Sequence, residues 1–291
     1  MKNSETIPNR GVMSNTEWRS PVGRLIGLFY LLVLVLASIF VLFPFLFSFT
    51  AGFKTSLEVF KPGIHLLPEK WNWQNYIDAW QRFKMVRMFI NTAIAAGGGV
   101  LAQIIVSSMA AYSLARLRPM GRNVIRAIIL ITMAIPGIAY LVPRYIIMTN
   151  LPIIHVSLVN SFWGLWIPYA CSSFMILVLT NAFEQIPKAF FEIAQVDGAS
   201  EVRMFFMIAL PLSSSIILVL GLLAFIGLWG DFLWPYLILR NSELQTVSVR
   251  LYTLTRSFPI NLYLAGSFIA MLPPTIAAVF LSQKIKGGLT I

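Results

Sequence analysis

The sequence has little charge, one cysteine and two histidines. Cys171, His65 and His155 are too few and too scattered for a disulfide framework or a Cys/His metal centre. Charged residues make up 11% of the 291 residues and hydrophobic residues 58%, whereas soluble domains average about 25% charged and about 45–50% apolar. A disordered chain carries far less apolar surface. The composition therefore predicts a helical protein that crosses a membrane several times.

Long runs without a charged residue mark the expected spans, because a membrane helix needs about 20 mostly apolar residues. Residues 1–24 are polar and predict a cytosolic N-terminal tail, and residues 25–291 predict one membrane domain. We expect an all-α, polytopic membrane protein whose six transmembrane helices lie at residues 25–52, 88–115, 125–147, 160–182, 211–237 and 262–283.

The basic residues favour one orientation in the membrane. The net charge of +11 comes from residues scattered between apolar blocks, so nucleic acid is not an expected partner. The turn at 116–126 holds four arginines and no acid, whereas the turn at 148–159 holds no lysine or arginine. By the positive-inside rule the 116–126 turn is cytosolic, and with six spans both termini are cytosolic too.

The segments expected on the opposite side hold ten lysines and arginines against five acids. Two interpretations of this excess stay open. It is either a face solvated by water and lipid headgroups, or a mouth that attracts an anionic solute through its potential.

The segment 183–210 predicts two short helices joined at Gly198, which permits a tight or left-handed joint. Ser200 is placed to cap the second helix, with Glu201 in its first turn. Pro211 is expected to open the fifth membrane helix. A paired amphipathic element of this length cannot cross a bilayer, and it suits a docking surface for a cytosolic partner.

This segment resembles the EAA loop of the permease subunits of binding-protein-dependent ABC importers. The resemblance rests on Glu192-Ile-Ala194, on Gly198 after three intervening residues, and on Ile208-Ala-Leu210-Pro211 after nine more; Ile193 replaces the usual small central residue. It implies the type I importer permease fold and a cytosolic loop that docks on the ATPase subunits. The implied ATPase-coupling residues are Glu192, Ala194, Asp197, Gly198, Ser200, Arg203 and Pro211.

Nearly the whole chain is similar to the carbohydrate importers, and within them to the smaller permease of the maltose transporter. The segments that carry this similarity are Asn91-Thr92, 110–116, Pro136, Pro143-Arg-Tyr145, Asn160-Ser161, 229–235 and 288–290. Within 229–235, Gly230 stands where the family usually has asparagine. The resemblance implies a bacterial inner-membrane subunit that forms a heterodimer with a second permease and binds two ATPase subunits.

The same resemblance implies that an extracytoplasmic solute-binding protein delivers the solute, and that this chain binds no cofactor, ATP and Mg being held by the ATPase subunits. By position, the segment from Thr253 through Pro259 to Asn261 resembles the loop that contacts the binding protein. The remaining partner is membrane lipid.

Five residues are candidates for the translocation pathway. Asp231 is the only acid placed inside a span, where ionisable groups are costly, and it is either a wetted helix end or a pathway group. Trp229 and Trp234 are interface anchors or platforms for a sugar ring. Arg144 either snorkels to the outer surface or meets an acidic sugar. Asn91 is included on the resemblance.

Gly97-Gly-Gly99 lies within the second expected helix. The sequence leaves two interpretations of it open, close helix packing or a kink used in gating.

We expect a transport subunit that is not itself an enzyme. The chain has no Gly-x-x-x-x-Gly-Lys-Ser/Thr phosphate loop. A membrane-embedded enzyme and a secondary transporter are the alternatives, but paired acids, histidine pairs and inverted repeats are not evident. The expected solute is an oligosaccharide or a glycerol-type compound, with the basic outer segments favouring an acidic one such as a uronate of the alginate kind.

Overall fold

The computed structural model describes residues 21–63 and 65–288, and beyond residue 280 it describes the side chain of Gln283 alone. Most of the predicted 1–24 tail and the end of the 288–290 segment lie outside these residues. The described chain is all-helical, as predicted, and holds no strand. The helices before the α10–α11 loop are α2 (Pro21–Gly52), α3 (Ser56–Val59), α4 (Gln74–Arg82), α5 (Met85–Tyr112), η1 (Ser113–Leu117), α6 (Arg122–Ala134), η2 (Gly137–Tyr140), α7 (Leu141–Thr149), α8 (Trp163–Tyr169) and α9 (Ser173–Gln185).

The second half of the chain contains the loop and the last spans. Its helices are α10 (Lys188–Val196), α11 (Glu201–Met204), η3 (Phe205–Ala209), α12 (Leu210–Leu212), α13 (Ser214–Gly230), α14 (Leu233–Ile238), α15 (Val247–Leu254) and α16 (Ile260–Gly288). The chain also contains two π-helical turns, η1 in its first half and η3 in its second. Turns of this kind are rare and are frequently found at functional sites.

Three spans are continuous and three are bent. The continuous ones are α2, Met85–Leu117 and Ile260–Phe280, and three bent helix pairs bring the number to six if each pair is one span. The predicted spans at 125–147, 160–182 and 211–237 correspond to the three bent pairs, and the sequence did not predict the bends. The pairs bend by 99° between α6 and the η2–α7 helix, by 48° between α8 and α9, and by 77° between the Glu201–Leu212 helix and α13.

Proline explains the first bend directly. Ile135 has an extended backbone (ψ 119°), as expected for a residue that precedes a proline, and Pro136 contributes no N–H to continue the helix. In the fifth span, the helix continues through Pro211 and ends at Leu212, so Pro211 does not open the membrane helix. That helix begins at Ser214 and ends at Gly230, before the expected residue 237.

Helix α5 lies at the centre of the bundle and contacts α8, α9 and α13. Close approach is possible because two of its three consecutive glycines lie against neighbours. A Cβ at Gly98 would come within 2.3 Å of the Trp166 ring, and one at Gly99 within 2.8 Å of Leu228. Gly98 and Gly99 therefore serve close packing, one of the two interpretations left open by the sequence, whereas Gly97 has nothing within 4 Å.

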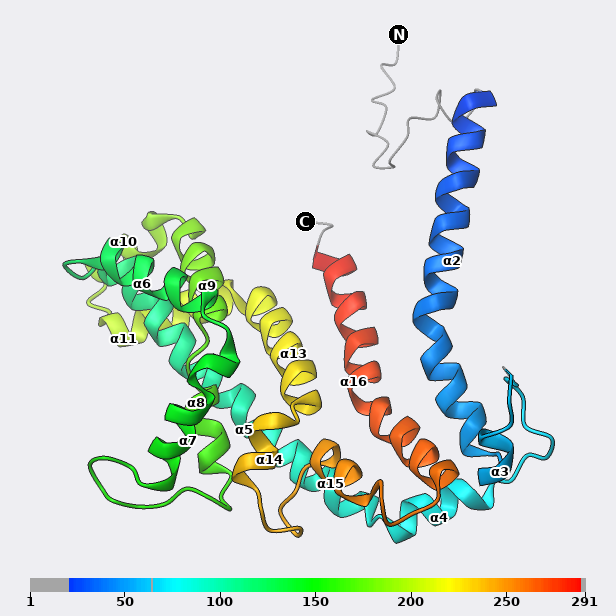
Figure 1. Ribbon diagram of the computed structural model, residues 1–291. Coiled ribbons are helices and arrows are strands. Elements are labelled where there is room, and N and C mark those ends of the chain that lie inside the picture. Colours follow the sequence, from blue (N-terminus) through cyan, green and yellow to red (C-terminus); the bar gives the residue numbers. More distant parts are fainter. Residues whose placement is uncertain (1–20, 64, 289–291) are drawn as a thin grey trace.

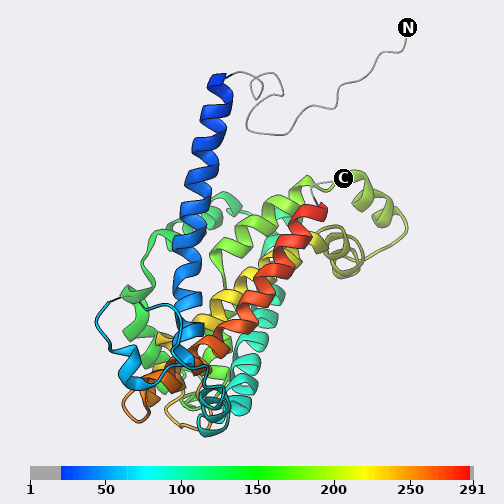
Figure 2. The same cartoon turned by 90° about the vertical axis from the view of Figure 1, so that its right-hand side faces the viewer.

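Helix α2 leans away from the rest of the bundle and contacts it near its own C-terminal end (Figures 1 and 2). There the Ser48 hydroxyl donates to the Leu264 carbonyl at 3.2 Å, and the Phe49 and Phe268 rings lie 4.9 Å apart. Most large side chains of α2 are exposed in the isolated chain. They form an apolar surface suited to lipid or to another membrane subunit.

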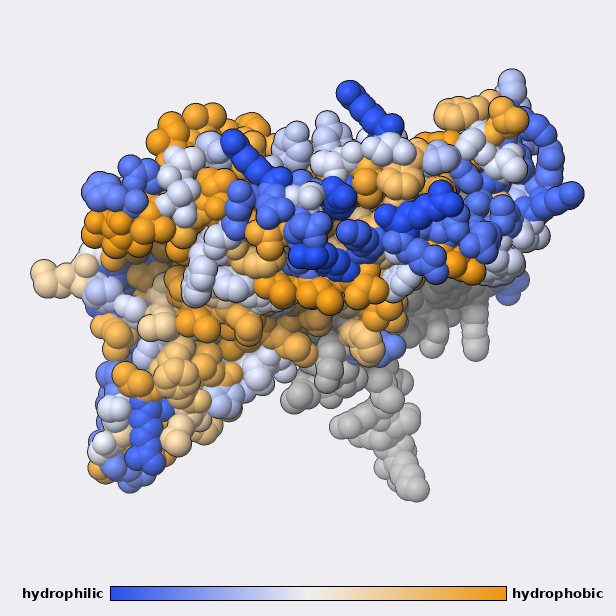
Figure 3. All heavy atoms as spheres, turned by 90° about the horizontal axis from the view of Figure 1, so that it is seen from below, coloured by the Kyte–Doolittle hydropathy of each residue, from blue (hydrophilic) through white to orange (hydrophobic). Residues whose placement is uncertain are grey.

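The chain has two chemically different ends. The first residues of α2 and the last of α16 lie toward the same end as α10 and α11 (Figure 1), as expected for an even number of spans. The other end carries α3, α4, α14 and α15, and Figure 3 shows hydrophilic residues gathered across it. Three of its ten basic residues pair with acids: Lys61 with Glu69, Arg82 with Asp78, and Arg87 with Glu243.

Candidate functional site

The loop between α9 and α13 folds as its sequence predicts. Helices α10 and α11 are joined through Gly198, whose φ of +78° lies in the left-handed region that glycine adopts without strain. The amide of Gly198 donates to the Gln195 carbonyl at 3.0 Å, which closes the end of α10. The Ser200 hydroxyl accepts from the Arg203 amide at 3.3 Å and caps α11.

The outer surface of this loop has few partners within the chain. The side chains of Glu192, Asp197, Ser200 and Arg203 are exposed, and Ala194 is half-buried against the core. Large apolar side chains are exposed beside them: Ile193 at 64%, Val196 at 88% and Val202 at 67%. Apolar and charged groups interspersed in this way are typical of a protein-binding surface.

The inner face of the loop is fixed to the C-terminal end of α5 and to η1, which continues it. The Tyr112 hydroxyl donates to Glu201 Oε2 at 3.0 Å. The Arg116 guanidinium lies 4.1 Å from the centre of the Phe191 ring and donates to the carbonyls of Phe183 and Ile186. A movement of α10 or α11 therefore acts directly on α5. Tyr112 and Arg116 belong to the segment 110–116, which is similar to the family, but the sequence predicted no role for either residue.

A pocket of about 230 Å³ opens between α5, α10 and α11. Three cations and two carboxylates are among the residues that line it. They are Tyr112, Ala115, Arg116, Arg118, Lys188, Phe191, Glu192, Gln195, Glu201 and Met204. This pocket has room for a side chain from a partner that covers the loop.

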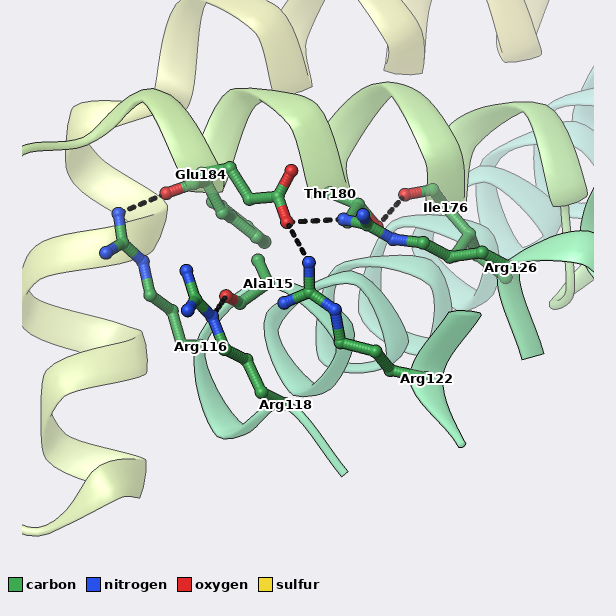
Figure 4. Close-up of polar contacts among 9 residues, drawn as sticks. Ala115, Arg116, Arg118, Arg122, Arg126, Ile176, Thr180 and Glu184 are labelled. Atoms are coloured by element: carbon green, nitrogen blue, oxygen red, sulfur yellow. Dashed lines mark hydrogen bonds and ion pairs between the residues drawn. The ribbon is translucent and has the colours of Figure 1, made fainter. Parts of the chain in front are cut away.

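The arginine-rich turn has a counter-charge that the sequence did not reveal. Glu184, at the end of α9, accepts from Arg126 at 2.5 Å and from Arg122 at 3.5 Å. Figure 4 shows these two arginines with Arg116 and Arg118 around the last turn of α9. Glu184 lies 58 residues from Arg126 in the chain, so their pairing depends on the packing of α6 against α9.

Away from the α10–α11 loop, a cluster around Arg144 brings together side chains from three different spans. The Arg144 guanidinium of α7 stacks 3.8 Å above the Trp234 ring of α14 and lies 5.5 Å from the Tyr169 ring of α8. The Tyr169 hydroxyl donates to Asp231 Oδ2, at the break between α13 and α14. We call these four residues, Arg144, Tyr169, Asp231 and Trp234, the Arg144 cluster.

Trp229 and Trp234 are both buried within the protein, so neither is an interface anchor. Trp229 is 6% exposed and donates to the Ala270 carbonyl at 3.3 Å. Trp234 is 2% exposed and donates to the Gly164 carbonyl at 3.1 Å. Arg144 is half-buried, and its guanidinium lies over the Trp234 ring.

Asn91 serves the fold of the chain. Its side-chain amide is buried and donates to the carbonyls of Glu243 at 2.9 Å and Gln245 at 3.1 Å. These bonds hold the loop between α14 and α15 against α5. In the isolated chain, the Asn91 side chain therefore does not face an open surface of the pathway.

The segment expected to meet the binding protein is only partly exposed. Thr253 and Pro259 are exposed at the connection between α15 and α16. Asn261 is buried, and its Oδ1 accepts from the Ser56 hydroxyl at 2.8 Å. Asn261 therefore joins α16 to α3, and the other two side chains remain available to a partner.

Comparisons with known proteins match this architecture. Residues 103–285 match the family described as "Binding-protein-dependent transport system inner membrane component". The chain is 28% identical to the sn-glycerol-3-phosphate transport system permease protein UgpE of Brucella melitensis, over 92% of this chain and 96% of that protein. It is 29% identical to the sulfoquinovosyl glycerol transport system permease protein SmoH of Agrobacterium fabrum, over 86% and 87%.

Solved structures show the same fold. A chain of a bacterial ABC transporter involved in the import of the acidic polysaccharide alginate has a TM-score of 0.78 and 24% identity, over 91% of this chain and 98% of that one. A chain of a bacterial alginate ABC transporter in complex with its pentasaccharide-bound periplasmic protein has a TM-score of 0.60 and 18% identity, over 88% and 92%.

The family match covers more than half of the chain, and the fold extends the likeness to most of the rest. The alternatives of a membrane-embedded enzyme and a secondary transporter do not describe this family. The protein therefore belongs to the inner membrane components of binding-protein-dependent transport systems, which are transport permeases and not enzymes.

Proposed function

We propose that this chain forms half of a heterodimeric translocation pathway for an acidic carbohydrate or glycerol derivative. A solute-binding protein delivers the solute at the α4–α15 end, which is extracytoplasmic. Two ATPase subunits, which hold ATP and Mg, dock at the cytosolic α10–α11 end, and both termini lie on that side. The four-arginine turn at this end supports the orientation.

The observation that carries the coupling role is the construction of the loop. It exposes an apolar and charged surface outward, while Tyr112 and Arg116 fix its inner face to α5. Force applied by a partner on α10 is thus transmitted to the central helix of the bundle. Glu192, Ala194, Asp197, Gly198, Ser200, Arg203 and Pro211 are the proposed ATPase-coupling residues.

The substrate class follows from the chemistry that the relatives' names share. The compared permeases are named for sn-glycerol 3-phosphate and sulfoquinovosyl glycerol, and the compared structures for the acidic polysaccharide alginate. Each of these solutes joins an acidic group to a sugar or to glycerol. The excess of basic residues at the α4–α15 end supports an anionic solute here too.

Two glycines give a matched test of the coupling role. Gly198→Asp introduces a side chain at a φ of +78° in the loop, and Gly121→Asp does the same at an equal φ in the 118–122 turn; neither position has an atom within 4 Å of the added Cβ. We expect Gly198→Asp and Glu192→Ala to abolish binding-protein-stimulated ATPase activity of the co-expressed complex. Full stimulation in both variants, or the failure of any ATPase to co-purify with the wild type, contradicts the proposal. Gly121→Asp reports the cost of backbone strain alone.

A further inference from the structure

The Arg144 cluster lies where broken helices meet. Tyr169 is the last residue of α8, directly before the bend into α9, and Asp231 lies in the break between α13 and α14. Arg144 belongs to α7, the second half of the span bent by 99°. Interrupted helices within a membrane protein are tolerated where protein or a polar cavity satisfies their backbone groups, and transporters often place solute sites there.

Arg144 is a cation without a hydrogen-bonding partner at two of its nitrogens. Nε and Nη2 are both buried and make no hydrogen bond among the described residues. The acid beside it does not neutralise it by contact: Asp231 accepts from Tyr169, and no ion pair joins Asp231 to Arg144 in the described chain. By contrast, four other arginines pair directly with carboxylates: Arg82, Arg87, Arg122 and Arg126.

The two unpartnered nitrogens form one edge of the guanidinium. The Nε–H and Nη2–H bonds on this edge run parallel, which is the geometry that binds a carboxylate, phosphate or sulfonate through two hydrogen bonds. The contact with Trp234 involves the face of the group and does not satisfy the two donors of this edge. A buried, unpaired donor pair of this kind is costly unless a ligand or a conformational change satisfies it.

We infer that the Nε–Nη2 edge of Arg144 binds the acidic group of the transported solute, while the carbohydrate or glycerol part extends along the pathway. Asp231 lies within electrostatic range of Arg144 and supplies the counter-charge in the empty site. It therefore competes with the bound anion and promotes its release. The inference rests on the proposed function and adds the residue that recognises the charge of the solute.

The test uses the whole importer in proteoliposomes with its binding protein and ATP. The labelled probes are alginate trisaccharide and sn-glycerol 3-phosphate. We expect Arg144→Gln to lower probe import about ten- to hundredfold, as the loss of charge-assisted hydrogen bonds predicts. Binding-protein-stimulated ATPase activity should remain, because the loop is untouched. Arg240→Gln is the matched control, since Arg240 also lies over a tyrosine ring, 5.6 Å from the centre of Tyr145.

Two further variants distinguish recognition of the solute by Arg144 from a role of Arg144 in folding and from an ion pair between Arg144 and Asp231. Arg144→Lys keeps the charge and much of the aliphatic side chain, so it should restore part of the import. If both Arg144 variants lose ATPase stimulation as well as import, the role of Arg144 is structural and the inference is wrong. Asp231→Asn should increase the amount of labelled probe retained on the ATP-bound complex. If it instead lowers retention as Arg144→Gln does, the two residues act as an ion pair and the inference is overturned.

The failures of the two proposals are distinguishable. If the wild type imports a probe and Arg144→Gln matches Arg240→Gln, the inference is wrong and the proposed function stands. If the wild-type complex imports neither acidic probe, the proposed substrate class fails and the inference fails with it.

Discussion

Adjacent glycines in α5 allow a direct test of the packing that supports the Arg144 cluster. A methyl group added at Gly98 meets three atoms of the Trp166 ring at 2.3–2.6 Å, whereas one added at Gly97 meets nothing within 4 Å. The Trp166 indole donates to the carbonyls of Ile94 and Ala95, at 3.2 Å each. The ring therefore cannot move aside without losing this bond.

These contacts give the two substitutions opposite signs. Alanine in place of glycine stabilises a helix by about 1 kcal/mol through backbone entropy. At Gly98 this gain is outweighed by overpacking, which costs about 1–3 kcal/mol, and by loss of the indole hydrogen bond, about 1 kcal/mol. We expect Gly97→Ala to stabilise by about 1 kcal/mol and Gly98→Ala to destabilise by about 1–3 kcal/mol.

The free energy of unfolding can be compared by titrating the purified permease complex in dodecylmaltoside with sodium dodecyl sulfate. Far-ultraviolet circular dichroism follows the unfolding transition of each variant. If the two variants agree to within about 0.5 kcal/mol, the range expected for substitutions away from packed features, then Trp166 does not pack against Gly98 as described.

Three other contacts give predictions of their own. Asn91→Ala leaves the Gln245 carbonyl without its side-chain donor and the Glu243 carbonyl with Arg87 alone, and should cost about 1–3 kcal/mol in the same titration. Tyr112→Phe keeps the ring and removes the bond to Glu201, so we expect ATP hydrolysis to continue while solute imported per ATP falls about fivefold, equivalent to ~1 kcal/mol. Unchanged coupling contradicts the role given to this bond. Glu184→Gln should cost only about 0.2–1 kcal/mol because its arginine partners are partly exposed, and the difference should vanish in 1 M salt.

The parts of the structure that sequence predicted well depend on local chemistry. The joint at Gly198 and the cap at Ser200 are formed by residues within five positions of each other, so their backbone geometry is encoded in one short segment. The positions of the spans are likewise set by local apolar runs. Helix bends are less local, because Pro136 ends a helix while Pro211 lies within one.

The Arg144 cluster could not be predicted because each of its members has two ordinary explanations when seen alone. An arginine near the end of a span is typically a snorkelling side chain, and a tryptophan there is typically an interface anchor. Neither explanation describes this pair, because the half-buried Arg144 lies over the buried ring of Trp234, 90 positions away. Stacking removes the indole from the interface and fixes the guanidinium with one edge unpartnered. The distinction between an anchored surface charge and a recognition site thus depends on the packing of α7 against α14, which the spacing of residues does not encode.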